Sequence, residues 1–156
     1  MTNKEFNEKC LKDRTVQKPA AVKIVGSDRD RDFLFKRALD NSDYFLKGTK
    51  VIAKSDAPYL AFILGFFAME HRAYAVALLY NSYQIEDHIC AQIYFSRVLG
   101  RKDLSKLLSD AWNARIGYNY RMDLSIEGDI KDVENFMEKI LKLFIAEIDK
   151  LIAEKS

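Results

Sequence analysis

The chain has 156 residues, of which 49% are hydrophobic and 31% charged, the balance of an ordinary globular domain, so extensive disorder is excluded. Lys and Arg number 25 against 23 Asp and Glu, and this net charge of +2 excludes a general basic coat for nucleic acid, so any polyanion has to bind locally. Two distant cysteines, Cys10 and Cys90, indicate neither a zinc site nor a disulfide framework. Because the N-terminus also lacks the apolar core of a secretory signal, we expect reduced thiols in a cytoplasmic protein.

Residues 1–27 carry the weakest pattern, and we treat them as an N-terminal arm that precedes a bundle domain over residues 28–156. An amphipathic turn is indicated around Cys10. The apolar stretch 20–25 fits three structures: an edge strand, an arm onto a partner subunit, or coil. The pattern does not choose among them.

Apolar residues at helical spacing, uninterrupted by proline, predict a first long helix from about Asp28 to Lys54. Its opposite face is basic and carries Arg29, Arg31, Lys36, Arg37, Lys47, Lys50 and Lys54. A solvated face is the favoured interpretation of these charges, and a stripe that contacts RNA is the alternative.

A capping side chain followed by proline, in Ser55-Asp56-Ala57-Pro58, predicts the start of a second helix that runs to about Tyr80. Because this helix is apolar on almost every side, we expect it to be the central helix of a bundle. Its apolar run 57–69 ends well short of the ~20 residues that a bilayer crossing needs, so we expect no membrane span.

The second helix has one strongly polar interruption, Glu70-His71-Arg72. For His71, the favoured interpretation is a core histidine that is hydrogen-bonded to a neighbour, and a catalytic or ligand-binding role is the alternative.

Three further helices are predicted. The third covers about residues 84–99, with Asp87 and His88 near its start. The fourth runs from Asp103 to Gly117 or Asn119, and the fifth from Gly128-Asp129 to the end of the chain. No convincing strand pair is visible. The sequence therefore predicts an all-α fold, an up-and-down bundle of about five helices joined by short links.

Arg115 lies where a core residue is expected. At 3.6 residues per turn it shares one stripe of the fourth helix with Leu104, Leu108 and Ala111. An unpaired guanidinium costs several kcal/mol or more to bury, so Arg115 needs an internal carboxylate, a helix end or an anionic ligand such as phosphate.

Several catalytic classes lose support because their motifs are absent. Neither histidine follows a glutamate by three positions, which excludes a carboxylate-bridged di-iron bundle. The chain also lacks the phosphate-binding, dinucleotide-binding, zinc-protease and serine-hydrolase signatures. We therefore expect no metal and no cofactor.

The order of four short motifs resembles the HEPN superfamily of small helical domains. The motifs are residues 66–74, which look like the family's second helix, residues 88–95, the pattern Arg115-x-x-x-x-Tyr120, and the long last helix. The similarity covers about residues 33–152. It implies an up-and-down helical bundle that often pairs as a homodimer.

The resemblance also implies two kinds of activity. Many members are metal-independent endoribonucleases with an R-x(4–6)-H motif, whereas others are non-catalytic partners of a small nucleotidyltransferase in toxin–antitoxin pairs. In this chain Tyr120 stands at the histidine position. Because a free tyrosine has a pKa of about 10, histidine-type proton transfer would need His88 or His71 from another helix.

Our first hypothesis is a homodimeric, HEPN-like module that binds a nucleotide or RNA phosphate through Arg115, Arg121 and the loop tyrosines Tyr118 and Tyr120, and that works with a nucleotidyltransferase. The second is a weak metal-independent endoribonuclease in which Arg115 acts with Tyr120 or His88. In the third, Arg115 merely forms an internal ion pair with a carboxylate, for which the candidates are Glu70, Glu86 and Asp87.

Overall fold

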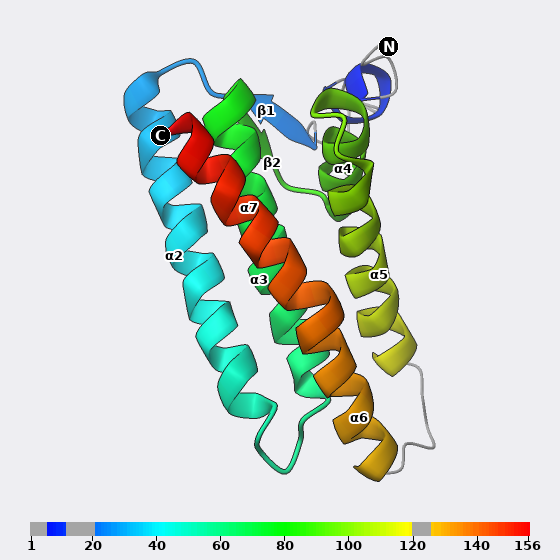
Figure 1. The fold of residues 1–156 in the computed structure, drawn as a ribbon. Coiled ribbons are helices and arrows are strands. Elements are labelled where there is room, and N and C mark those ends of the chain that lie inside the picture. Colours follow the sequence, from blue (N-terminus) through cyan, green and yellow to red (C-terminus); the bar gives the residue numbers. More distant parts are fainter. Residues whose placement is uncertain (1–5, 12–20, 120–125) are drawn as a thin grey trace.

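Residues 6–11, 21–119 and 126–156 are described by a computed structural model (Figure 1). The elements are η1 (Asn7–Leu11), β1 (Val22–Ile24), α2 (Asp28–Ile52), α3 (Leu60–Asn81), β2 (Tyr83–Ile85), α4 (His88–Ile93), η2 (Tyr94–Val98), α5 (Lys102–Asn119), α6 (Ile126–Phe136), η3 (Met137–Leu141) and α7 (Lys142–Lys155). The three η segments are short stretches of π-helix.

The long helices form an up-and-down bundle, which confirms the predicted all-α fold. In Figure 1, α2 descends, α3 returns, α5 descends again, and α6, η3 and α7 rise together as one long rod. α3 lies at the centre, since it packs against α2, α5 and α7. It contributes more buried residues than any other described element, as expected for a helix that is apolar nearly all round.

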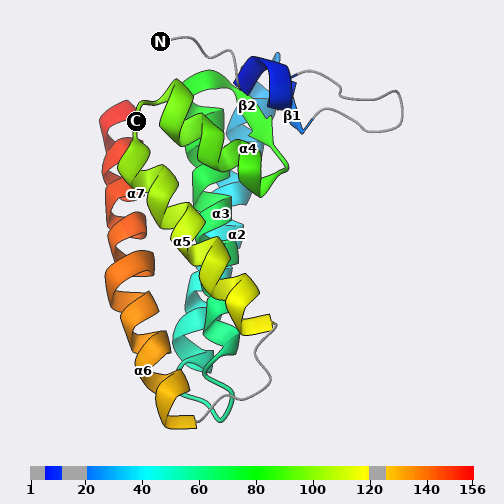
Figure 2. The same cartoon turned by 90° about the vertical axis from the view of Figure 1, so that its right-hand side faces the viewer.

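A two-stranded sheet lies near the upper end of the bundle in Figures 1 and 2, so the prediction of no strand pair was wrong. β1 pairs antiparallel with β2, so that Val22 lies opposite Ile85 and Ile24 opposite Tyr83. Of the three alternatives considered for residues 20–25, the strand is the one observed, at Val22–Ile24. Ser82 has a left-handed φ of 56° and ends α3, so the next residues run extended instead of starting the helix expected from residue 84.

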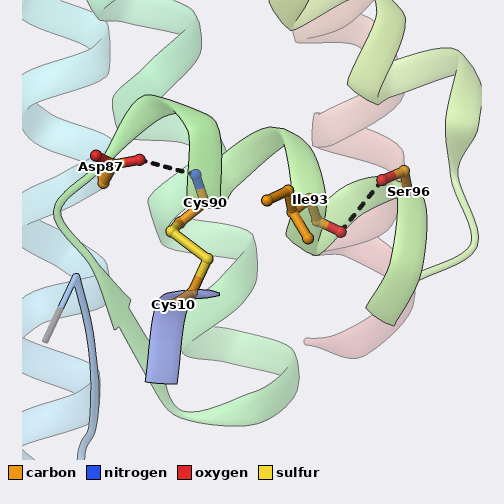
Figure 3. The surroundings of a disulfide bond; sticks show 5 residues. All are labelled: Cys10, Asp87, Cys90, Ile93 and Ser96. Carbon is orange, nitrogen blue, oxygen red and sulfur yellow. Dashed lines mark hydrogen bonds between the residues drawn. A yellow bond between two sulfur atoms is a disulfide. The ribbon is translucent and has the colours of Figure 1, made fainter. Parts of the chain in front are cut away.

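Cys10 and Cys90 form a disulfide, so the expectation of two reduced thiols was wrong. Figure 3 shows the bond between η1 and the first turn of α4, beside the Asp87 side chain that caps α4 by accepting a hydrogen bond from the Cys90 N–H at 2.9 Å. The two Cα atoms are 5.8 Å apart across a sequence separation of 80 residues. Phe6, which precedes η1, is fully buried, and its ring packs against the ring of Tyr83 in β2. The N-terminal segment is thereby fastened to the core.

The start of α3 differs from the prediction. The helix begins at Leu60, after a turn around Pro58, and its N-cap residue Tyr59 makes no side-chain capping bond. The 22 residues of α3 are long and apolar enough to cross a membrane by length and composition, yet the bundle buries 61% of their apolar stretch. Core packing accounts for that hydrophobicity, and the absence of a membrane span stays a prediction.

Arg72 clamps three helices together on one face of α3. Its side chain is 11% exposed, and its guanidinium donates to Asp43 of α2 at 2.7 Å, to Asp149 of α7 at 2.9 Å and to the Ser42 hydroxyl at 3.0 Å. A buried guanidinium is tolerated because its donors are satisfied by carboxylates and a hydroxyl. Arg72 therefore ties α3 to both α2 and α7.

A close approach of the last rod to α3 requires a glycine at position 65. A Cβ on Gly65 would lie 2.6 Å from the ring of Phe136, which is itself buried. We expect Gly65→Ala to lower the free energy of unfolding by about 1–3 kcal/mol, because the ring has no free space into which to move. Urea unfolding followed by circular dichroism measures the change.

Gly48→Ala is the matched control. A Cβ there meets only a Leu64 methyl at an ordinary 3.5 Å, so the substitution is expected to stabilise α2 by up to about 1 kcal/mol through helix propensity. Equal effects of the two substitutions would show that the approach at Gly65 is not tight.

Candidate functional site

Three neighbouring polar residues of α3 face three different sides of the helix, because successive residues are turned by about 100°. Arg72 belongs to the clamp with α2 and α7. His71 lies towards α2, with its ring stacked at 5.5 Å on Phe45. Glu70 lies on the side of α5 and α4, where its charge interacts with Arg115 and His88. The candidate site lies on this third side.

Arg115 rests on a bed of aromatic rings. Its Cζ atom lies 4.8 Å from the centre of the Phe67 ring, 5.2 Å from that of Trp112 and 5.4 Å from that of Phe66. The predicted stripe is confirmed, since Leu104, Leu108 and Ala111 on the same helix are buried. Arg115 itself is half-buried. Cation–π contact stabilises a guanidinium in this position without neutralising it.

Trp112 contacts both His88 and Arg115 and so links the two side chains. The imidazole, in the first turn of α4, stacks on the indole of α5 with ring centres 3.7 Å apart and planes 20° from parallel. Asp87 fixes the start of α4 through its capping bond and thereby positions His88, the first residue of that helix. Both residues are half-buried.

Glu70 is the anionic centre of the cluster. Burial raises the pKa of its carboxyl above the usual 4.5, while a hydrogen bond from Tyr74 and the charges of His88 and Arg115 oppose that rise. Burial also raises the pKa of the Tyr74 hydroxyl, and the Glu70 charge adds to the effect, so this tyrosine stays a hydrogen-bond donor.

The internal ion pair considered for Arg115 is not formed with any residue that the structure describes. The Arg115 guanidinium has three ring contacts, and its interaction with Glu70 is electrostatic at longer range. Asp87 is engaged as the cap of α4, and Glu86 pairs with Lys23 at 3.5 Å. Within the described chain, the charge of Arg115 therefore remains available to an anion.

A groove adjoins the cluster on the α2 side of α3, and we call it the α2–α3 groove. It encloses about 550 Å³ between α2, α3 and β2, and its lining includes Arg37, Phe45, Phe67, Glu70, His71 and Tyr74. Phe67 and Glu70 belong both to this groove and to the surroundings of Arg115. The cation and the groove thus share one wall.

His71 makes ring contacts in place of the expected hydrogen bond. Besides the stack on Phe45, its ring meets Tyr74 edge-on at 5.8 Å. Burial lowers the pKa of His71, which keeps the imidazole neutral near pH 7. Among the described residues, no hydrogen bond of this ring is present, so His71 acts as an aromatic surface of the groove.

Of the predicted site residues, the structure places some together, and the others lie outside the described part of the chain. Arg115 and His88 lie together, joined through Trp112 and Glu70. Tyr120 and Arg121 lie outside the described residues, and so does the side chain of Tyr118. Within the described ranges, no group of three or more His, Cys, Asp or Glu side chains is arranged to hold a metal ion.

Sequence reasoning missed the roles of Glu70, Trp112 and Phe67. Glu70 was considered only as an ion-pair partner, although a single carboxylate on an otherwise apolar helix was a usable signal. Trp112 lies three residues before Arg115, one helical turn away, and this spacing predicts contact between the two side chains. Nothing local connects Phe67 to Arg115.

The raised pKa of Glu70 predicts how stability varies with pH. The folded chain binds this proton more tightly than the unfolded chain does, so the associated stability is complete below about pH 4.5 and is lost as pH rises through the folded-state pKa. We therefore expect Glu70→Gln to be more stable than the original chain at pH 8 and equal to it at pH 4, in urea unfolding. Glu134→Gln, at an exposed position, is the control, and a similar gain there would contradict the assignment.

Comparisons of the chain with protein-family models, with curated proteins and with solved structures found no match. The resemblance to the HEPN superfamily therefore stays a prediction that rests on the motifs of this sequence. What the bundle itself establishes is an all-α architecture with a half-buried cationic and aromatic cluster on the α4–α5 side of its central helix.

Proposed function

We propose that this chain is a HEPN-like module that binds a nucleotide or single-stranded RNA, with Arg115 on the phosphate. The observation that supports the proposal is the half-buried guanidinium, seated on Phe66, Phe67 and Trp112 with no ion pair to a described residue. Aromatic contact covers the faces of a guanidinium and leaves its N–H edge free, and that edge matches two phosphate oxygens.

The stacked pair of His88 and Trp112 extends the site towards bases. Aromatic side chains beside a cation are what single-stranded nucleic acid binds, because bases stack on the rings while the cation meets the backbone. Trp112 touches both Arg115 and His88, so one ligand can contact all three side chains.

Homodimer formation and a nucleotidyltransferase partner belong to the same proposal. They derive from the resemblance carried by Arg115-x-x-x-x-Tyr120 and residues 88–95. The cytoplasmic location was expected from reduced cysteines, and the disulfide counts against it, because such bonds persist in oxidising compartments and are rare in most reducing ones. Light scattering of the purified chain measures the oligomeric state, and a monomer at all concentrations would remove the dimer from the proposal.

Trp112 makes the proposal directly testable, since it is the chain's one tryptophan and lies in the site. Titration with a short single-stranded RNA at low salt is expected to quench its fluorescence with saturation. Because phosphate contacts release counterions, the affinity should fall steeply with added salt. Unchanged fluorescence, together with no binding by an independent anisotropy titration of labelled RNA, would overturn the proposal.

A weak metal-independent endoribonuclease is the second candidate. The geometry that favours it is the placement of His88, Glu70 and Arg115 within one electrostatic cluster. In this reaction the RNA 2′-hydroxyl attacks the adjacent phosphorus, a base takes the hydroxyl proton, and the 5′-oxygen leaves with a proton, which gives a 2′,3′-cyclic phosphate. Arg115 would stabilise the charge on phosphorus and His88 would move protons, with Tyr120 as the other candidate from the sequence.

Labelled RNA incubated with EDTA distinguishes the two candidates. Cyclic-phosphate ends that disappear with His88→Ala would support the enzyme, whereas RNA that stays intact at high protein concentration would leave a binding module. A contaminating nuclease would cleave equally in the His88→Ala preparation, whereas Phe35→Ala on α2, outside the cluster, is expected to cleave like the original chain if the activity is its own.

A further inference from the structure

The α2–α3 groove begins beside Arg115. The ring of Phe67 lies under the Arg115 guanidinium at 4.8 Å and also lines the groove, and Glu70 lines the groove while its charge interacts with Arg115. A ligand with its phosphate on Arg115 therefore has the groove within reach of its neighbouring group. This placement suggests that one ligand occupies both.

The chemistry of the groove differs from that of the Arg115 cluster. Its walls offer aromatic faces from Phe45, His71 and Tyr74, the carboxylates of Glu70 and Glu86, and one guanidinium from Arg37 on α2. Carboxylates repel a second phosphate but accept hydrogen bonds from N–H groups. The groove is thus suited to the planar, donor-bearing part of a ligand.

A volume of about 550 Å³ lies within the range of small-molecule sites and leaves room for a base with its ribose. Of the two carboxylates that line the groove, Glu70 is half-buried, whereas Glu86 is exposed. An ionised carboxylate has about four lone-pair sites, and the described groups that interact favourably with the Glu70 carboxylate are Tyr74, His88 and Arg115. Glu86, in contrast, is engaged by Lys23 at 3.5 Å and Gln84 at 3.2 Å.

We propose that the α2–α3 groove binds a guanine base, with the Glu70 carboxylate accepting from its Watson–Crick edge. This inference rests on the proposed function, because the same ligand places its phosphate on Arg115. Guanine presents two adjacent N–H donors, on N1 and on its amino group, which match the two oxygens of a carboxylate. Adenine, cytosine and uracil lack two adjacent donors on that edge, so a carboxylate that accepts from one of their N–H groups faces a repelling acceptor with its other oxygen.

The test uses the full chain and ligands that separate the two halves of the site. Amide NMR titration with guanosine, which carries no phosphate, reports on the groove, whereas titration with inorganic phosphate reports on Arg115. We expect guanosine to shift amides of α2 and β2, to bind at least tenfold more tightly than uridine or adenosine, and to gain affinity when supplied as the 5′-monophosphate.

Two matched variants assign the selectivity to one carboxylate. Glu70→Gln replaces an oxygen acceptor by an amide donor that opposes a guanine N–H, so it is expected to lower guanosine affinity about tenfold. Glu86→Gln makes the same chemical change at the engaged carboxylate of the groove and is expected to alter the affinity less than twofold.

The outcomes separate this inference from the proposed function. Phosphate binding without guanosine binding would overturn the groove assignment and leave the Arg115 site standing. Equal affinity for all four nucleosides, or unchanged selectivity in Glu70→Gln, would overturn the role of Glu70. Both assignments would be supported if guanosine binds and if the higher affinity of its 5′-monophosphate disappears in Arg115→Ala. The absence of any binding would remove both.

Discussion

Arg115→Ala is expected to lower the affinity of the chain for short single-stranded RNA by about 10- to 150-fold at low salt. The reason is the loss of a charge-assisted contact between guanidinium and phosphate, for which about 1.5–3 kcal/mol is typical. The fold should survive, because the three cation–π contacts that disappear are partly offset by release of a half-buried charge. Titration followed by Trp112 fluorescence, with thermal unfolding of the same samples, measures both effects.

Two further variants show whether the effect comes from the geometry of the guanidinium or from charge alone. Arg115→Lys keeps the charge but loses the planar fork and its ring contacts, so its affinity should lie between those of the original chain and Arg115→Ala. Arg29→Ala removes the same charge from the exposed first turn of α2 and should change affinity less than about threefold. Equal losses in Arg115→Ala and Arg29→Ala would show that binding follows net charge and not this site.

The double substitution Cys10→Ala with Cys90→Ala is expected to lower the free energy of unfolding by about 4 kcal/mol. A cross-link between residues 80 positions apart removes much of the freedom of the unfolded chain, and the chain-entropy relation gives this magnitude for a loop of that length. For a domain of this size, the loss corresponds to a fall in Tm of about 10 °C. Both positions are buried, so alanine is used in place of serine, whose hydroxyl would be left there without a hydrogen-bond partner.

Reductant supplies the control for the disulfide. Added to the original chain, it should reproduce most of the stability loss, and added to the double variant it should change nothing. Because Cys90 lies in the first helical turns that begin at His88, Trp112 fluorescence should also respond to reduction in the original chain. A chain whose unfolding is insensitive to reductant would contradict a stabilising role for the bond between η1 and α4.

The helical framework was predicted well because helix formation depends on local spacing. The stripe that contains Leu108 and Ala111 repeats every three to four residues, and the structure buries it as expected. The last rod was predicted as one helix and forms as α6, η3 and α7, with a π-helical stretch that leaves the period intact. Arg115 was found by the same reasoning, since a charge on an apolar stripe is visible in the sequence alone.

Short elements and long-range contacts were not predicted, because neither leaves a recognisable pattern in the local sequence. Strand pairing between Val22 and Ile85, and the bond between Cys10 and Cys90, depend on residues that are distant in the chain and become neighbours only when the bundle assembles. Three-residue strands leave too few alternations to be distinguished from coil. A cysteine pair with a separation of 80 residues has no local signature at all.

From its own periodicity, this sequence determined an all-α bundle, a central apolar helix and a guanidinium on a buried stripe. Tertiary structure alone decided what surrounds that guanidinium: Phe67 from α3, the stacked pair of His88 and Trp112, and a carboxylate that also lines a groove. Spacing along a helix fixes which side of the helix a residue occupies. Which helix lies opposite that side depends on how the whole core packs.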